Sequence, residues 1–448
     1  MRIRRRLFNS PGRTILLSLL LIILVGTMLL HSSWAHKEPL SWLDALFTAT
    51  SAVSVTGLMV APLEAFTRPG QIIILALVQI GALGLITLTV FFLSLFRTMH
   101  LSTKHITGEA LELAAGQNPR SLATFTMLFT ITAECIGWFL CYICILPQYT
   151  GKKAWYISAF HAISSFCNYG VTPLDISSLT ATMPYRYGAL LSITACLVLI
   201  GSLGFIVWRE LCIYVTTPRQ HKYIHMSLHT RLVLSATIAC IIITSIVLFM
   251  LEYASPCVAH PSLRALAEPL FNAICLRSAG FTTLPLATVR VATLFLIMIL
   301  CFIGSSPGST GSGVKVTTFA ICIATIRAIL LRKSTVEIKG RTIANEQVFK
   351  AIAILALSVS WLACTIFLLL ITESSITPFN IMFEAFSAFT NLGVTIHATT
   401  THLSWVGKLI IIISMAIGRI GSLTMIFALK KQESVKEFHY PEERVFMS

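Results

Sequence analysis

The sequence predicts an all-α membrane protein built from four pseudo-symmetric repeats around a central pore. Its residues are 56% hydrophobic and 11% charged, whereas about 25% of the residues of a typical soluble domain are charged. Eight apolar runs are long enough to cross a bilayer, which takes about 20 residues. Four single glycines, Gly57, Gly170, Gly280 and Gly393, recur at intervals of 113, 110 and 113 residues. An internal repeat at a fixed interval predicts equivalent structural units.

The apolar runs pair into four repeats of one order: a spanning helix, a short pore helix, a filter stretch and a second spanning helix. The repeats are predicted at residues 1–96, 97–216, 217–331 and 332–448, and the last ends in a cytoplasmic tail. The spanning runs are 14–34, 70–96, 121–146, 187–215, 231–251, 290–303 with 316–331, 347–371 and 405–430.

A short amphiphilic segment lies between the two spans of each repeat, at 41–52, 155–166, 263–276 and 378–389. Twelve helical residues cover about 18 Å, which is roughly half of the ~30 Å hydrocarbon core. Backbone that leaves the helix at that depth must line water or protein, so we expect four pore helices. Surface amphipathic helices are the alternative, but they do not explain the shared glycine phase. Phenylalanine also recurs at nearly one phase (Phe47, Phe160, Phe271 and Phe383), although Leu270 disturbs the pattern in the third repeat.

The glycines predict a selectivity filter. Glycine adopts backbone conformations that are closed to other residues, so that consecutive carbonyl groups can face one axis and replace the water shell of a cation. The flanking side chains vary, which indicates that the backbone touches the ion. A single glycine per stretch predicts fewer ion sites than a two-glycine potassium-channel filter would form, and Leu58 and Met59 make the first filter bulkier. The predicted ion-binding residues are Val55, Thr56, Gly57, Asn168, Tyr169, Gly170, Ser278, Ala279, Gly280, Asn391, Leu392 and Gly393.

The segment 304–313 contains four glycines, four serines, one threonine and one proline between two apolar runs. In a helix interior glycine costs about 1 kcal/mol and proline about 3 kcal/mol relative to alanine, so the helix must unwind in mid-membrane. We expect a polar, mobile gate that lines the pore, with a rigid packing kink as the alternative. Its predicted gate residues are Gly304, Pro307, Gly308, Gly311 and Gly313, with Lys315 just below.

Arg419 is the second predicted gate, because it lies inside an apolar run between Gly418 and Gly421. A charge at this depth is costly unless it faces water or a partner. We expect its side chain to project into the pore below the filter as an electrostatic barrier. The alternative is an arginine that extends to the cytoplasmic interface.

The 33 Lys and Arg residues are unevenly distributed. The termini and the inter-repeat loops carry 22 of them, while the opposite side carries 9. By the positive-inside rule this asymmetry places both termini in the cytoplasm. The net charge of +15 therefore orients the protein and does not indicate nucleic-acid binding. A cleavable N-terminal signal is disfavoured, because its removal would leave the first repeat without its outer helix.

These features together resemble the ion-conducting subunit of the Trk/Ktr/HKT superfamily of potassium transporters, over residues 14–430. The resemblance rests on the filters, the broken helix 304–315, Gly418-Arg419-Ile420-Gly421 and Tyr440-Pro441-Glu442-Glu443. It implies uptake of K⁺, with Na⁺ as a second candidate, across the cell inner membrane, in contact with lipid. It also implies that the 304–313 loop closes the path below the filter, and that no covalently bound cofactor is needed.

The resemblance further implies a homodimer and a cytoplasmic ring of nucleotide-binding regulatory subunits. These subunits would dock on the basic loops 97–120, 209–231 and 327–350 and on the C-terminal tail. The chain has no phosphate-binding pattern G-x-x-x-x-G-K-[ST] after a strand. Any control by a nucleotide therefore requires a separate partner.

Two other functions were weighed against a passive uptake pathway. A symporter that couples K⁺ to protons or Na⁺ needs a carboxylate in the membrane, and Glu134 is the best candidate. A membrane enzyme needs a cluster of nucleophile, base or metal ligands at membrane depth, and the sequence has none. Cys141 and Cys144 form a C-x-x-C pair in mid-helix, where small packing residues are the simpler account. We therefore expect a protein that is not an enzyme.

Overall fold

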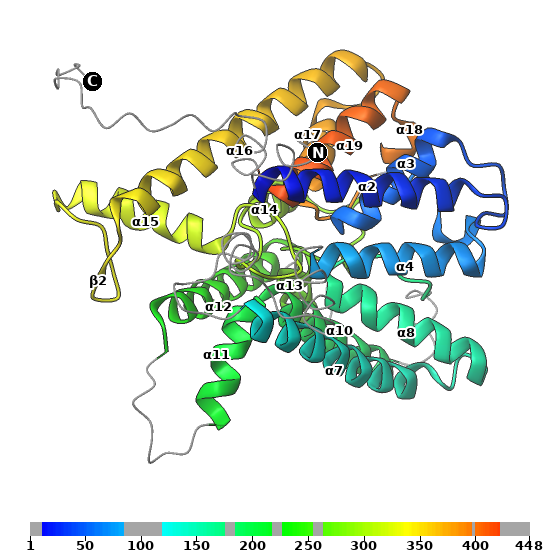
Figure 1. Cartoon of the computed structure of the whole chain (residues 1–448), viewed down its shortest axis with the longest axis horizontal. Coiled ribbons are helices and arrows are strands. Elements are labelled where there is room, and N and C mark those ends of the chain that lie inside the picture. The colour runs from blue at the N-terminus through cyan, green and yellow to red at the C-terminus, as the bar shows by residue number, and fades with distance from the viewer. Residues whose placement is uncertain are drawn as a thin grey trace, which may run out of the picture.

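The computed structural model describes residues 11–84, 119–174, 184–216, 226–253, 263–396 and 399–421. Regular structure in these residues is helical, apart from one small hairpin of β1 (Glu337–Ile338) and β2 (Arg341–Thr342). Figure 1 shows α2, α4 and α7 running lengthwise across the view, with α11 and the hairpin projecting at the left end. The all-α prediction is confirmed.

Each predicted repeat contains a first spanning helix, a pore helix and a second spanning helix, and the last of these is broken in the third repeat. The first repeat consists of α2 (Pro11–His31), α3 (Trp42–Ser54), the short turn η1 (Leu63–Ala65) and α4 (Arg68–Leu83). The second consists of α7 (Pro119–Ile145), α8 (Gly151–Cys167), α10 (Pro184–Ser202) and α11 (Phe205–Thr216). The third consists of α12 (Leu228–Leu248), η3 (Phe249–Tyr253), α13 (Leu263–Cys275), α14 (Val291–Phe302) and α15 (Val316–Leu330). The fourth consists of α16 (Asn345–Thr372), α17 (Pro378–Thr390), α18 (Thr399–His402) and α19 (Trp405–Ile420).

Among the described residues, three helices are long and apolar enough to cross a membrane unbroken: Arg120–Ile145, Leu228–Glu252 and Asn345–Thr372. Large apolar side chains on these helices, such as Phe139, Ile243 and Phe367, are exposed. Extended apolar surface of this kind indicates contact with lipid. The predicted ends of the spans 70–96 and 405–430 lie outside the described residues.

The predicted span 187–215 is not one straight helix, which corrects the sequence interpretation. It is divided into α10 and α11, whose axes differ by 100°. Gly204 lies at the break with a φ of 90°, and a Cβ there would lie 2.5 Å from the carbonyl oxygen of Pro307. The broken segment of the third repeat therefore packs against the backbone at the bend.

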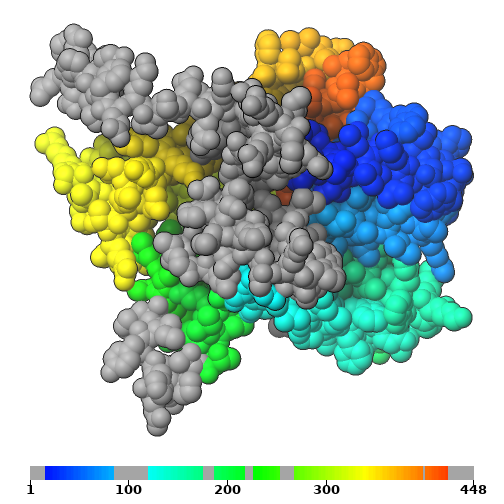
Figure 2. All heavy atoms as spheres, viewed as in Figure 1, coloured from blue at the N-terminus to red at the C-terminus, as the bar shows by residue number. Residues whose placement is uncertain are grey.

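The four repeats close into a ring. Figure 2 shows them following one another around the molecule in chain order, from blue through cyan and green to yellow and orange. The second long helix of each repeat contacts the pore helix of the next: α4 with α8, α10 with α13, α14 with α17, and α19 with α3. The last of these contacts joins the fourth repeat to the first.

Capping residues and proline explain where two of the short helices begin. Ser41 caps α3 by accepting a hydrogen bond from the Asp44 backbone N–H at 3.1 Å, and Pro378 occupies the first turn of α17, where its missing N–H costs nothing. α8 begins at Gly151, four residues before the predicted start. The recurring phenylalanines are all buried, and they are Phe47, Phe160, Phe271 and Phe383.

Candidate functional site

The four predicted filter glycines meet in one place. Each has a positive φ of 90°, 82°, 70° and 84° in chain order, in the region that favours glycine. A Cβ added to any of them would collide with the backbone of the neighbouring repeat. The contacts run from Gly57 to the oxygen of Tyr169 (2.1 Å), from Gly170 to that of Ala279 (2.1 Å), from Gly280 to that of Leu392 (2.3 Å), and from Gly393 to that of Thr56 (1.9 Å). These four contacts form a closed circuit through all four repeats.

A serine six residues before the glycine shapes three of the four filter stretches. The backbone N–H groups of Thr56, Tyr169 and Leu392 return to the carbonyls of Ser51, Ser164 and Ser387 at 2.8, 2.9 and 2.9 Å. The serine hydroxyls also bond the stretch itself, for example Ser51 Oγ, which accepts from Gly57 N at 3.1 Å. In the third repeat Ile274 stands at this position, and the N–H groups of Ala279 and Gly280 both donate to the carbonyl of Cys275. The sequence analysis missed this serine, although its fixed offset from the glycine was visible.

Two asparagine side chains of the filter stretches bond neighbouring repeats. Asn168 and Asn391 occupy the same position, two residues before the glycine, and both have left-handed backbones. Asn391 Nδ2 donates to Thr56 Oγ1 at 2.7 Å and so joins the fourth filter to the first. Asn168 Nδ2 donates to Thr310 Oγ1 at 2.6 Å and so joins the second filter to the broken segment of the third repeat.

The helix break lies where the composition predicts it, between the end of α14 at Phe302 and the start of α15 at Val316. We call residues 303–315 the gate loop. Its two ends pair through a bridge between Ile303 and Val314. Its middle is bound to the end of α10, because Ser306 Oγ donates to the Ser202 carbonyl at 2.8 Å.

Arg419 and the gate loop, predicted as two separate features, contact each other. Arg419 Nη1 donates to the Thr310 carbonyl at 2.5 Å and to Ser312 Oγ at 3.2 Å. Nη2 donates to the carbonyls of Gly81 and Ala82 at the end of α4, the second at 3.2 Å. The guanidinium group therefore bridges α19, the gate loop and the end of α4.

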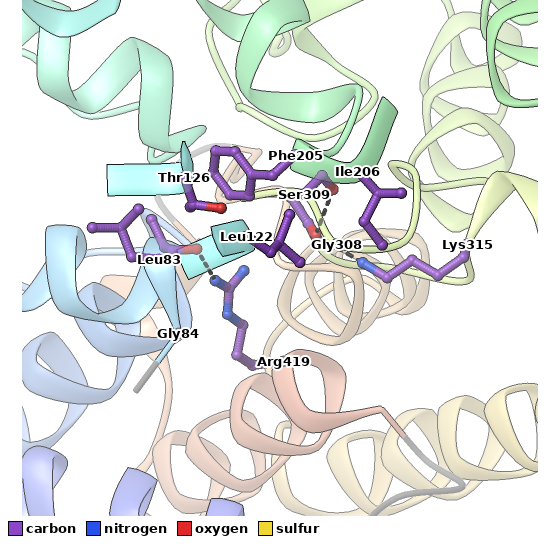
Figure 3. Close-up of a pocket in the computed structure, with 12 residues that line it drawn as sticks. Leu83, Gly84, Leu122, Thr126, Phe205, Ile206, Gly308, Ser309, Lys315 and Arg419 are labelled. Carbon is purple, nitrogen blue, oxygen red and sulfur yellow. Dashed lines mark hydrogen bonds between the residues drawn. The ribbon is translucent and has the colours of Figure 1, made fainter. Parts of the chain in front are cut away.

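A cavity of about 210 Å³ lies beside this bridge. Figure 3 shows Arg419 reaching from α19 across it towards the end of α4, while Lys315 enters from the far side. Of the predicted gate residues, Gly308, Gly311, Lys315 and Arg419 line the cavity. Lys315 Nζ donates to the Gly311 carbonyl at 2.8 Å, which places its charge against the loop.

The remaining gate glycines and proline shape the loop without lining the cavity. A Cβ on Gly304 would lie 2.1 Å from the Ser312 carbonyl oxygen, and Gly313 has a positive φ of 82°. These two glycines allow the ends of the loop to approach each other closely. The Pro307 carbonyl oxygen faces Gly204 at the bend between α10 and α11.

A recurring pair of glycines at the end of the second long helix escaped the sequence analysis, except in the fourth repeat. A Cβ on Gly81, Gly201 or Gly418 would lie 2.0, 2.0 or 1.8 Å from the last carbonyls of the preceding pore helix. Three residues later, Gly84, Gly204 and Gly421 have positive φ angles of 75°, 90° and 88°. The third repeat has Cys301 and Gly304 at the matching positions. These glycines bring each second helix against the base of its filter.

Arg277 lies behind the third filter. Its side chain is only 2% exposed, and Nη2 donates to Ser202 Oγ at 3.0 Å. Within the described residues its Nη1 makes no hydrogen bond. Ser202 therefore contacts both the third filter segment and the gate loop.

Glu134 lies between α4, α7 and α8 and not along the cavity. Gln79 Nε2 donates to Glu134 Oε1 at 2.8 Å. Cys167 Sγ donates to Gln79 Oε1 at 3.2 Å. Cys167 directly precedes Asn168, so this polar cluster lies behind the second filter.

The fold and this site define a helical membrane transport protein whose four repeats converge on one glycine ring. The family model for TrkH, described as cation transport protein, matches residues 20–440. The chain belongs to this family, which confirms the resemblance found in the sequence. Proteins of this family are transporters, and the protein is not an enzyme.

Curated relatives match over nearly the whole chain. The Ktr system potassium uptake protein B of Bacillus subtilis is 34% identical over 98% of this chain and 96% of its own length. The potassium/sodium uptake protein NtpJ of Enterococcus hirae is 33% identical over 100% of this chain and 98% of its own length. The crystal structure of the potassium transporter TrkH from Vibrio parahaemolyticus matches with a TM-score of 0.73 at 19% identity, covering 94% of this chain and 86% of that one. This last likeness supports the fold.

Proposed function

We propose that this protein takes up K⁺, with Na⁺ as a second permeant ion, through the ring formed by its four filter stretches. The closed circuit of glycine contacts carries this proposal, because it brings four carbonyl-bearing stretches to one axis. The names of two relatives support the choice of ions, since one is a potassium and the other a potassium/sodium uptake protein.

In this mechanism the filter replaces the hydration shell of the ion with backbone carbonyls. The residues that supply them are the twelve predicted from the sequence, three in each repeat. Glycine at the centre of each stretch allows the close approach of neighbouring backbones that a carbonyl ring requires. The hydrogen bond from Asn391 to Thr56 holds the fourth and first stretches at a fixed distance.

The gate loop and Arg419 form the barrier below the filter. Arg419 holds the loop against the end of α4 through four hydrogen bonds. A cation that leaves the filter would meet the charges of Arg419 and Lys315 at the cavity. Conduction therefore requires the loop to part from Arg419 and from the end of α10.

The orientation and the partners complete the proposal. Both termini lie in the cytoplasm of a cell whose inner membrane holds the protein, and two copies form a homodimer. A ring of nucleotide-binding regulatory subunits docks on the cytoplasmic side. The β1–β2 hairpin lies within the proposed docking loop 327–350. Three basic residues of this loop are exposed, Arg332 before the hairpin and Lys339 and Arg341 in it. The docking loop 97–120 lies almost entirely outside the described residues.

Ion flux into liposomes that contain only the purified protein tests the function. We expect K⁺ influx down its gradient, with Na⁺ slower, when each alkali cation is offered in turn. Empty liposomes measure the leak. Flux no higher than this leak for every cation would contradict the proposal.

A coupled symporter remains the second candidate, because Glu134 lies in a polar cluster that reaches Cys167, the residue before the second filter. Protonation of a carboxylate next to a filter changes the charge there and so affects ion binding.

A further inference from the structure

The pore helices of the second, third and fourth repeats each carry one buried polar side chain behind the filter. Each of these side chains bonds a threonine located two residues after the filter glycine: Thr172, Thr282 or Thr395. The three side chains differ chemically, but each directly follows the recurring phenylalanine of its pore helix. We call these three contacts the filter braces.

In the second repeat the brace is His161, which is 2% exposed. Its Nε2 lies 2.8 Å from Thr194 Oγ1. Because the Thr194 hydroxyl gives its proton to the Leu190 carbonyl, Nε2 must donate. Nδ1 then accepts from Thr172 Oγ1 at 3.0 Å. Thr172 Oγ1 also accepts from the backbone N–H of Leu174 at 3.2 Å, which extends the brace along the chain.

In the third repeat the brace is Asn272, whose side chain is fully buried. Asn272 Oδ1 accepts from Thr282 Oγ1 at 3.1 Å and from Thr283 N at 3.0 Å. Its Nδ2 donates to Thr283 Oγ1 at 2.8 Å. Thr282 Oγ1 accepts from Leu284 N at 3.0 Å, which repeats the arrangement at Thr172.

In the fourth repeat the brace is Glu384, which is also fully buried. Thr395 Oγ1 donates to Glu384 Oε2 at 2.9 Å, and Thr400 Oγ1 donates to Oε1. Both carboxyl oxygens therefore accept hydrogen bonds from hydroxyl groups in the segment that follows the filter glycine. The two ion pairs found among the described residues, Lys333–Glu337 and Lys408–Asp44, do not involve it.

The described part of the first repeat shows no equivalent brace. Met59 stands two residues after Gly57, and its thioether offers no hydroxyl. Thr48 occupies the position of Glu384, but the hydrogen bond that the structure gives it runs to the Asp44 carbonyl within α3. In three repeats the chain after the filter glycine is therefore bonded to the pore helix through side chains. In the first repeat this part of the chain is packed by apolar groups such as Leu58.

We propose that the filter braces set the discrimination between K⁺ and Na⁺ by fixing the outer ends of three filter stretches. This inference rests on the proposed function. Where selectivity depends on the size of the carbonyl ring, the ring favours the larger ion as far as it resists contracting around the smaller one. A hydroxyl bonded behind the filter resists that contraction without touching the ion, so the braces are positioning residues.

The test compares Thr395→Val with Thr395→Ser in purified protein in liposomes. Valine removes the hydroxyl that bonds Glu384, while serine keeps it. Loss of a net hydrogen bond worth about 1 kcal/mol lowers the K⁺-to-Na⁺ flux ratio by about fivefold. Thr395→Ser should keep the wild-type ratio. The matched control is Thr365→Val in α16, where the hydroxyl bonds only its own helix at Trp361.

The K⁺-to-Na⁺ flux ratio separates a positioning role from a general structural role. General structural damage would lower the K⁺ and Na⁺ fluxes together and leave their ratio unchanged. If wild-type protein passes no cation, the proposed function fails. If wild-type protein is selective and Thr395→Val keeps its ratio, the inference about the braces is wrong. If Thr395→Val does not yield folded protein, Thr172→Val in the second repeat decides by the same ratio.

Discussion

Residues at the same position in different repeats of this ring have different hydrogen-bond partners. Asn168 and Asn391 have the same backbone conformation, yet one bonds the gate loop and the other bonds the next filter. Their common role is local, because asparagine tolerates the left-handed backbone that ends these pore helices. The side-chain partner depends on what the neighbouring repeat presents. Pseudo-symmetry therefore fixes the backbone and leaves the side chains free to diverge.

Among the four filter glycines, Gly393 has the closest backbone neighbour. Its φ is 84°, and a Cβ would lie 1.9 Å from the Thr56 carbonyl oxygen. A left-handed backbone costs about 1–2 kcal/mol for a residue with a side chain, and the collision with the first filter adds to that cost. We expect Gly393→Ala to lower K⁺ uptake at least tenfold, as measured by liposome flux and by growth of cells deficient in potassium uptake.

The control for this substitution is Gly188→Ala. Gly188 lies in α10, and a Cβ there would meet nothing within 4 Å. Alanine is also the better helix former by about 1 kcal/mol. Gly188→Ala should therefore transport normally. Wild-type uptake by Gly393→Ala would show that the ring does not carry the ion.

At the scale of elements, the gate loop is bonded to three other elements in addition to the bridge between its own ends. It bonds the end of α10 through Ser306, the second filter through Thr310 and α19 through Arg419. Because Arg419 also bonds the end of α4, one side chain joins the first, third and fourth repeats. A movement of the loop must break contacts with all of its neighbours.

Removing the bridge tests whether Arg419 acts by its charge or by its hydrogen bonds. Arg419→Ala removes both, so we expect K⁺ flux in liposomes to rise severalfold over wild type. Arg419→Lys keeps the charge but lacks the planar fork that reaches several acceptors at once. If the hydrogen bonds hold the loop, the lysine variant should also conduct faster than wild type.

Two results would contradict this account. Flux in Arg419→Ala that equals wild-type flux would end the barrier hypothesis. Wild-type flux in Arg419→Lys, together with raised flux in Arg419→Ala, would assign the barrier to charge alone. Both variants need equal amounts of folded protein in the membrane, which a size-exclusion profile in detergent measures.

At the scale of the whole molecule, most of the helical architecture can be predicted from the sequence. Helix content, the four short helices and the break at 304–313 are properties of composition and spacing, and the structure agrees with them. The bend at Gly204 was missed because the run 187–215 is apolar and its glycines resemble ordinary helical ones. Its cause is the gate loop, which belongs to another repeat. The contact of Arg419 with Thr310 joins residues 109 positions apart, and no local pattern encodes it.

The position of Glu134 relative to the ring and the cavity bears on whether transport is passive or coupled. The ring and the cavity lie between all four repeats, whereas Glu134 lies between α4, α7 and α8 only. A passive pathway needs only an open gate and a gradient, while coupling needs a carboxylate that binds and releases a proton in each cycle. Glu134 accepts a hydrogen bond from Gln79, and a glutamine amide oxygen can accept the same bond.

We therefore expect Glu134→Gln to keep both passive K⁺ flux and uptake under an imposed pH gradient, each within about twofold of wild type, since one retained hydrogen bond changes little in stability. The measurement is K⁺ influx into liposomes with and without a pH difference, at equal K⁺ gradients. Loss of the pH-driven component with passive flux intact would reverse the conclusion. Glu134 would then be a coupling carboxylate that acts on the second filter through Cys167, and the protein would be a symporter built on a channel-like ring.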